Sequence, residues 1–283
     1  MNVTPVAPSS LTQALLTVEG LAKSYGDGPS ILHDVNLSFR EGEFVVILGL
    51  SGAGKSTFLR CLNRLVAPTS GRILVQGNLL KDSAQGLVDV AALPERELRA
   101  WRRRVGMIFQ QFNLVKRLSV LQNVLSGSLG YQRFFPSLLR WFPAAAYKRA
   151  LANLERVGLL EQAEQRADRL SGGQQQRVAI ARALMQQPTL ILADEPVASL
   201  DPKLSVVVLD TLQRVAREDR ITVLVSLHVL ELARRYADRI VGFQGGRVVF
   251  DGPPEALTDE VVELIYRRPE ISRGPVVGVQ PDV

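Results

Sequence analysis

The feature that most constrains this sequence is a glycine-rich segment that fits the pattern G-x-x-x-x-G-K-[S/T]. It reads Gly49, Leu50, Ser51, Gly52, Ala53, Gly54, Lys55, Ser56 and Thr57. The apolar run Phe44–Leu48 precedes it, which predicts a buried strand. The segment after it predicts a helix with four apolar side chains on one face, namely Phe58, Leu59, Leu62 and Leu65. The sequence therefore predicts a strand, a phosphate-binding loop and a helix in succession.

Each part of this loop suits phosphate groups for a physical reason. Its glycines let the backbone wrap around phosphates, and its N–H groups and the start of the helix supply positive potential. Lys55 adds a point charge for the β- and γ-phosphates, and the Ser56 hydroxyl can ligate Mg²⁺. A chance glycine-rich turn is the alternative, but the strand and helix on either side argue against it.

A second feature is the apolar run Leu190–Ala193, which ends in Asp194 and Glu195. Carboxylates at the end of a buried strand are costly unless a cation meets them. In a parallel α/β sheet this edge is where ligands bind. We expect Asp194 to hold Mg²⁺, directly or through water, and Glu195 to polarise the attacking water. A strand end with solvated acids remains the alternative when the run is considered alone.

A third feature separates this chain from most proteins with such a loop. It reads Leu170, Ser171, Gly172, Gly173, Gln174, Gln175, Gln176 and Arg177. Ser171 is a plausible N-cap for a helix over Gln174–Met185, and the free N–H groups there form an anion site without a lysine. An ordinary cap and turn is the alternative for this segment alone.

The remaining pattern predicts an α/β fold. Strands are expected at Leu15–Val18, Ile31–Phe39, Arg72–Gln76, Val105–Gln110, Leu190–Asp194 and Thr222–Ser226, and a hairpin at Arg239–Phe243 and Arg247–Phe250. Runs without alternation indicate a parallel sheet covered on both faces. Residues 111–169 have a helical texture, punctuated by Pro136, Pro143 and Gly158. The single cysteine, Cys61, excludes an intrachain disulfide.

The chain carries a net charge of +6, which suits anionic ligands without choosing among them. Its tightest basic cluster, Arg99 with Arg102–Arg104, lies beside Trp101, and we interpret it as a solvated helix end. No apolar run approaches the roughly 20 residues that cross a bilayer, so a membrane role is expected to come through a partner.

The order of these motifs resembles that of the ATP-binding cassette (ABC) ATPases, over roughly residues 15–255. The resemblance implies a P-loop NTPase with an ABC-type nucleotide-binding domain: a mixed sheet core, an N-terminal antiparallel β subdomain and a helical subdomain. We expect a flexible N-terminus at residues 1–14, followed by a RecA-like core with the antiparallel β subdomain and the P-loop at 15–110. A helical subdomain is expected at 111–169. The signature helix, acidic strand end, D-loop and switch region follow at 170–255, and a C-terminal helix and tail at 256–283.

The resemblance also implies roles for individual residues. Tyr25 matches the aromatic residue that stacks on adenine, Gln110 the Q-loop glutamine that senses Mg²⁺ and γ-phosphate, and His228 the switch histidine. Ser199, Leu200 and Asp201 match the D-loop, where many relatives have Ala at 199 and Ser at 198. The implied catalytic residues are Glu195, His228 and Gln110. The implied ligands of Mg²⁺ are Ser56, Gln110 and Asp194. The remaining expected ATP contacts come from the P-loop, from Asp201 and from Ser171, Gly172, Gly173 and Gln174. His33 has no match and is interpreted as structural.

Proteins of this family sandwich two ATP molecules between two cassettes arranged head to tail. The resemblance therefore implies a second copy of this chain as partner, two membrane permease subunits and, indirectly, a periplasmic or lipoprotein solute-binding protein. The expected location is the cytoplasmic face of the inner membrane, peripherally bound. No nucleic-acid partner is expected. An ATPase of DNA repair or chromosome structure would place a long coiled coil before the signature, and no sustained heptads occur here.

Finer signals resemble the ATPases of phosphonate importers. The first signal is the segment Val105–Leu125, with Asn113, Leu114 and Val115 after the Q-loop. The second is the segment 193–202, and the third is the aromatic part of the helical insert at 111–169. Importers of phosphite or hypophosphite look very similar, and an importer of another small solute, such as a polar amino acid, is the main competitor. The insert also predicts a docking surface for a short permease helix, beside Gln110–Leu114 and formed by Phe134, Phe135, Leu138, Leu139, Trp141 and Phe142.

Overall fold

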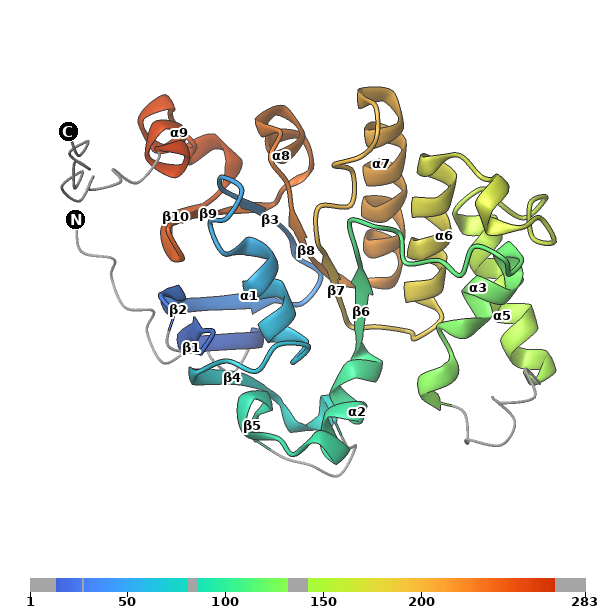
Figure 1. The fold of residues 1–283 in the computed structure, drawn as a ribbon, viewed down its shortest axis with the longest axis horizontal. Helices are drawn as coiled ribbons and strands as arrows, with labels where there is room; N and C mark the ends of the chain where they lie inside the picture. The colour runs from blue at the N-terminus through green and yellow to red at the C-terminus, as the bar shows by residue number, and fades with distance from the viewer. Residues whose placement is uncertain (1–13, 27, 81–85, 132–141, 268–283) are drawn as a thin grey trace, which may run out of the picture.

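The computed structural model describes residues 14–26, 28–80, 86–131 and 142–267, and it contains two sheets (Figure 1). The larger sheet has six strands, in the spatial order β10-β9-β3-β8-β7-β6. Their bounds are β3 (Phe44–Leu48), β6 (Val105–Ile108), β7 (Leu190–Ala193), β8 (Thr222–Ser226), β9 (Arg239–Gln244) and β10 (Arg247–Gly252). All neighbours pair in parallel except β9 and β10, which form the predicted hairpin. The sheet is therefore mixed, as predicted.

The smaller sheet is antiparallel and has the order β2-β1-β4-β5. Its strands are β1 (Ala14–Ser24), β2 (Ser30–Arg40), β4 (Ser70–Gln76) and β5 (Leu87–Asp89). Figure 1 shows it at the end of the molecule opposite α3 and α5. This confirms an N-terminal antiparallel β unit, in which β5 is a strand that sequence patterning did not predict.

The central strands carry apolar side chains on both faces, because each face packs against a different layer. Along β3, Val45 and Ile47 join the core formed with α1 and the antiparallel sheet. Phe44, Val46 and Leu48 join the core formed with the helices of the other layer. Consecutive apolar residues in a strand are the pattern expected of a parallel sheet covered on both sides.

Helices cover these layers. They are α1 (Lys55–Leu62), α2 (Glu95–Arg104), α3 (Val120–Ser126), α5 (Ala144–Arg156), α6 (Gly172–Leu184), α7 (Pro202–Asp219), α8 (Leu230–Tyr236) and α9 (Asp259–Tyr266). Helices α3, α5 and α6 contact one another and form the helical end of the molecule (Figure 1). In the described part of the chain, none of the helices has the length and apolarity needed to span a bilayer.

Helices α3 and α5 lie within the segment that we expected to be helical, of which residues 132–141 are outside the described ranges. Pro143 precedes α5, and Gly158 follows it with φ +67°. Of the predicted docking residues, Phe142 packs edge to face with Tyr147 at a centroid distance of 6.4 Å. The others, Phe134, Phe135, Leu138, Leu139 and Trp141, lie outside the described residues, as do Pro136, the N-terminal segment 1–13 and the tail 268–283.

One local prediction was wrong. Leu65 is 49% exposed rather than buried with Phe58 and Leu59, because α1 ends at Leu62 and the chain turns at Arg64, which has φ +52°. The basic cluster interpreted as a helix end does lie at the end of α2, and Trp101 beside it is fully buried, with its indole N–H donating to the carbonyl of Leu62. Arg102, Arg103 and Arg104 occupy the last turn of α2, where positive side chains interact favourably with the helix dipole.

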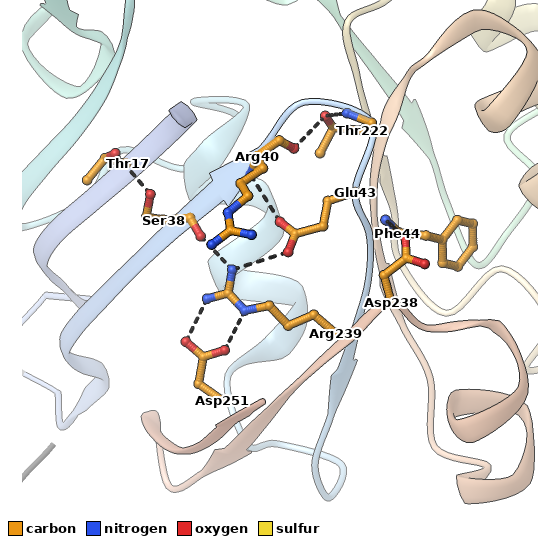
Figure 2. Close-up of polar contacts among 10 residues, drawn as sticks. Thr17, Ser38, Arg40, Glu43, Phe44, Thr222, Asp238, Arg239 and Asp251 are labelled. Atoms are coloured by element: carbon orange, nitrogen blue, oxygen red, sulfur yellow. Dashed lines mark hydrogen bonds and ion pairs between the residues drawn. The ribbon is translucent and has the colours of Figure 1, made fainter. Parts of the chain in front are cut away.

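The two sheets are joined by a polar network at the amino-terminal edge of the central strands (Figure 2). Arg239, at the start of β9, makes two bonds to the Asp251 carboxylate, of 2.5 and 2.6 Å. It also donates to the carbonyl of Ser38 on β2 at 2.7 Å, and Glu43 Oε1 lies 3.6 Å from its Nη1. Glu43 in turn accepts from the backbone N–H of Arg40. One half-buried guanidinium thus connects β2, β9 and β10.

Arg239→Ala is expected to lower the free energy of unfolding by about 3 kcal/mol, because it leaves Asp251 and Glu43 without a cation in a partly buried place. The measurement is chemical denaturation at constant m-value. Arg72→Ala is the control, since Arg72 pairs with Glu19 while 64% exposed, and we expect it to cost less than about 1 kcal/mol. Equal losses in the two variants would contradict a special role for the Arg239 network.

Candidate functional site

The loop after β3 buries the ammonium group of Lys55 at the carboxyl edge of the central sheet. The Lys55 side chain is 4% exposed, and its Nζ donates to the carbonyls of Gly49 at 2.8 Å and Leu50 at 3.0 Å. Glu195 Oε1 lies 3.7 Å from the same nitrogen. Burial lowers the pKa of Lys55, and the neighbouring carboxylates of Glu195 and Asp194 oppose this shift. The structure thus places a buried positive charge at the start of α1, and its N–H groups point into the loop.

Two glycines of this loop are required by its geometry. Gly49 has φ +153°, and a Cβ there would lie 2.5 Å from the carbonyl oxygen of Phe243 on β9. Gly54 has φ +98°, and a Cβ there would lie 2.9 Å from Leu32 Cδ2 on β2. Both strands therefore approach the loop too closely for a side chain. The other loop residues named from sequence line the same turn: Ser51 and Gly52 are exposed, Ala53 is buried, and Thr57 is half-buried.

Asp194 lies opposite the loop, directly after β7. Its carboxylate is 4% exposed and accepts a 2.6 Å bond from Ser56 Oγ and a 3.2 Å bond from Arg60 Nη2. A hydroxyl and a carboxylate oxygen in direct contact are donors of the kind that Mg²⁺ takes, and Mg²⁺ normally needs only one or two protein ligands beside waters and phosphates. The described residues contain no cluster of three or more His, Cys, Asp or Glu that could form an all-protein metal cage. The donors present therefore fit a nucleotide-bound Mg²⁺.

Glu195 has an unusual backbone conformation, which a serine on the next strand supports. Its φ is +47°, in the left-handed region that costs a non-glycine residue free energy. Its N–H donates to Ser226 Oγ at 2.9 Å, and the same hydroxyl lies 3.4 Å from Asp194 Oδ1. Ser226 is fully buried at the end of β8. Its hydroxyl therefore ties the two acidic residues to the neighbouring strand.

Ser226→Ala is expected to reduce the rate of ATP hydrolysis about tenfold while changing the KM for ATP by less than about twofold, because it releases the backbone that aims Glu195 without removing a predicted phosphate contact. Steady-state phosphate release measures both constants. Ser128→Ala is the matched control, since Ser128 is also buried and donates to one carbonyl, that of Leu125. A fall in kcat that is equal in both variants would show a general loss of packing instead.

The signature segment starts α6 as predicted. Ser171 is the N-cap, and its hydroxyl accepts from the N–H of Gln174 while the Gln174 side chain accepts from the N–H of Ser171. A Cβ on Gly172 would lie 3.1 Å from Leu200, and one on Gly173 would lie 3.3 Å from Leu204. The small residues therefore let the signature segment pack against the D-loop and α7. Asp201 caps α7 by accepting from the N–H of Leu204 at 3.0 Å.

Gln110 follows the end of β6 and is exposed. The segment after it is tied to the signature helix by Arg182, which donates to the carbonyls of Phe112 at 3.0 Å and Asn113 at 2.5 Å. Burial lowers the pKa of the Arg182 guanidinium. A link between the Gln110 segment and α6 is therefore built into the fold.

The remaining predicted residues make no hydrogen bond or ion pair with the Lys55 and Asp194 cluster within the described ranges. Tyr25 is 50% exposed, with Lys23 Nζ 4.6 Å from its ring centroid. His228 is exposed and follows β8, and its carbonyl accepts from Tyr266 Oη. Across the described ranges, no hydrogen bond or ion pair joins Tyr25, Gln110 or His228 to Lys55, Ser56, Asp194 or Glu195. His33 contacts the β9–β10 turn through a bond from its N–H to Gly246 O, which fits a structural residue.

Sequence reasoning missed three residues that support this site: Arg60, Arg182 and Ser226. Arg60 carried the only available signal, because it lies five positions after Lys55 on the same short helix. Ser226 and Arg182 act on segments far away in the sequence, and no local pattern marks such contacts.

Parallel strands that bring a lysine-bearing glycine loop and an acidic strand end into contact at their carboxyl ends define a P-loop nucleotide-binding protein. Comparison with known proteins narrows this class. Residues 32–198 match the family model described as ABC transporter. The chain is 52% identical over 253 residues to "Phosphonates import ATP-binding protein PhnC 2" of Halalkalibacterium halodurans, covering 89% of this chain and 100% of that protein. It is 49% identical to the protein named PhnC of Shouchella clausii, covering 95% and 97%.

Solved structures with a similar fold agree with this family match. The cbiO1 protein of Clostridium perfringens, described as part of the ABC transporter complex cbiONQ, is 30% identical, with a TM-score of 0.73 over 88% of this chain and 93% of that one. A dimeric ATP-binding cassette in a post-hydrolysis state with ADP and Pi is 35% identical, with a TM-score of 0.69 over 84% and 98%. The chain belongs to the ABC transporter family of ATP-binding proteins, which confirms the fold class and the resemblance inferred from its motifs.

Proposed function

We propose that this chain binds MgATP at the loop after β3 and hydrolyses it to energise the import of phosphonates through a partner permease. The observation that carries the site assignment is the pairing of buried Lys55 with Glu195 and of Ser56 with Asp194 at one edge of the sheet. The relatives named for phosphonate import are about half identical over nearly the whole chain, and this supports the choice of solute.

In this proposal the loop binds the phosphates of ATP with its N–H groups, and Lys55 exchanges its carbonyl partners for phosphate oxygens. The added negative charge raises the pKa of Lys55, so the bound lysine stays protonated. Ser56 and Asp194 hold Mg²⁺, with Gln110 as the third ligand. When bound, Mg²⁺ neutralises charge on the phosphate oxygens.

Glu195 is proposed as the residue that orients and deprotonates the attacking water. The water oxygen forms a bond to the γ-phosphorus, the bond between that phosphorus and the bridging oxygen breaks, and the water proton passes to the Glu195 carboxylate. His228 and Gln110 are proposed to contact the γ-phosphate side, and Tyr25 to stack on adenine. All three are exposed and available to a ligand.

The proposed working form is a pair of copies with ATP between them. Each site would take its second half from the partner's Ser171–Gln174 segment, and Asp201 would lie at the same interface. The helix start at Ser171 offers N–H groups to an anion. A dimeric relative with ADP and Pi supports this arrangement. The pair would bind two permease subunits at the cytoplasmic face of the membrane, and a solute-binding protein would deliver the solute.

Uptake of a labelled alkylphosphonate tests the proposed solute. Cells that express this chain with its neighbouring permease and binding protein are expected to accumulate the label, with little competition from unlabelled phosphite or phosphate. Strong competition by phosphite would assign the transporter to inorganic phosphorus oxyanions. Absence of uptake, with a competent ATPase, would contradict phosphonate import and favour another solute such as a polar amino acid.

A further inference from the structure

A cavity of about 700 Å³ lies between α2 and the turn that follows α3, away from the nucleotide site. Helix α2 contributes most of the charged groups that line it, and the turn contributes an aromatic ring on the other side. Its charged and aromatic lining consists of Arg96, Arg99, Arg102, Arg103, Glu95 and Tyr131. None of these residues belongs to the P-loop, the signature segment or the acidic strand end.

The charges in this lining do not balance. Glu95 is paired with Arg102 at 2.5 Å. Arg102 also donates to the carbonyls of Asn63 at 3.4 Å and Arg64 at 2.7 Å. The single carboxylate of the lining is therefore neutralised by one arginine, and Arg96 lies 3.6 Å from the Glu97 carboxylate on the same helix. Among the described residues, Arg99 and Arg103 have no carboxylate partner and remain as positive charge around the cavity.

One of these arginines is held rigidly. Arg103 Nε donates to the carbonyl of Gly130 at 2.6 Å, and its guanidinium lies 5.0 Å from the ring centroid of Tyr131. Tyr131 Oη is fixed in turn by bonds to the carbonyls of Arg103 at 3.2 Å and Gln186 at 2.8 Å. No described residue accepts a hydrogen bond from the two terminal nitrogens of Arg103, which leaves them for a ligand.

Arg99 is the second arginine whose guanidinium is available to a ligand. It is exposed and has no ion pair or hydrogen bond to any residue in the described ranges. The helix dipole explains cations in the last turn of α2, but not Arg99 and Arg96, which lie about one and two turns earlier, respectively, and line the same cavity. Several guanidinium groups facing one concavity are the arrangement that recognises a phosphate or carboxylate group.

We propose that this cavity is a binding site for a phosphate-type dianion, either a free phosphorus oxyanion or the phosphate monoester of a lipid headgroup. Planar guanidinium groups bind such oxygens two at a time, and the cavity is large enough for a free ion or for a headgroup. A second cavity, of about 310 Å³, shares Arg102 and Gln186 with this one and reaches Phe109 and Asn113. The proposed site therefore adjoins a cavity that reaches the segment carrying Gln110. This site is independent of the proposed phosphonate transport.

The test uses the purified full chain with its nucleotide site saturated by MgADP. Inorganic phosphate and methylphosphonate are titrated by calorimetry, and sedimentation is measured with phosphatidylcholine vesicles that contain or lack phosphatidic acid. Arg99→Glu is expected to weaken the relevant interaction by about tenfold or more. Arg103→Lys, which keeps the charge but loses the planar fork, is expected to weaken it less. Lys148→Glu, the same charge change at an exposed position on α5, is the control and should bind like wild type.

Arg99-dependent binding of the soluble anions identifies a free oxyanion as ligand, and Arg99-dependent binding of phosphatidic acid vesicles alone identifies a lipid headgroup. Equal affinities in wild type, Arg99→Glu and Lys148→Glu, or no binding of any probe by wild type, would overturn the proposal.

Discussion

Glu195→Gln is expected to reduce ATP hydrolysis by a factor on the order of 10² to 10⁴ while leaving ATP affinity nearly unchanged. The amide keeps the shape of the side chain but cannot accept a proton from water. The backbone at Glu195 is set by the bond from its N–H to Ser226, which the substitution does not touch. Steady-state phosphate release gives the rate, and binding of a fluorescent ATP analogue gives the affinity.

Glu263→Gln is the control for this variant. It makes the same chemical change at an exposed position on α9, and we expect normal rates from it. If Glu195→Gln also turned over ATP at the wild-type rate, Glu195 would not be the group that activates water, and another acceptor near the loop would have to be sought.

Lys55→Ala is the second substitution with a large expected effect: affinity for MgATP should fall by one to two orders of magnitude, and hydrolysis by more. The lysine provides the buried positive charge nearest the bottom of the loop, and its removal leaves the phosphates without that partner. It also leaves Glu195 without its nearest cation, at 3.7 Å in the structure. Equilibrium binding of MgATP and phosphate release measure the two effects.

A melting curve separates this effect from misfolding, because Lys55→Ala also removes the bonds to Gly49 O and Leu50 O. Lys148→Ala, at an exposed lysine, controls for loss of one charge. Wild-type affinity in a folded Lys55→Ala protein would argue that the loop after β3 is not the ATP phosphate site.

Much of the core could be predicted from sequence because its signals are local. Strands β3 and β8 have the predicted bounds, since both are short apolar runs bordered by loop residues. The N-cap at Ser171 was predicted because a serine before two glycines and a helical pattern is itself the structural signal. Ser56 and Asp194 were expected near one another because parallel strands bring their carboxyl ends together, although their direct hydrogen bond was not predicted.

The rest depended on contacts that no local pattern encodes. The left-handed conformation of Glu195 is supported by Ser226 on another strand, so the sequence around Glu195 gives no sign of it. The burial of Trp101 could not be predicted, because its neighbours are charged and its hydrogen-bond partner, the carbonyl of Leu62, lies 39 residues away in the sequence. The junction at Arg239 joins segments about two hundred residues apart, and it could be identified only once the sheets were in place.

The most direct test of the central claim is to measure ATP hydrolysis and alkylphosphonate uptake in the same proteoliposomes, assembled from this chain, its permease and its binding protein. We predict that wild type and Glu263→Gln show both activities, and that Glu195→Gln loses both together while still assembling with the permease. Uptake that persists in Glu195→Gln without hydrolysis would contradict the claim that this chain powers the transport.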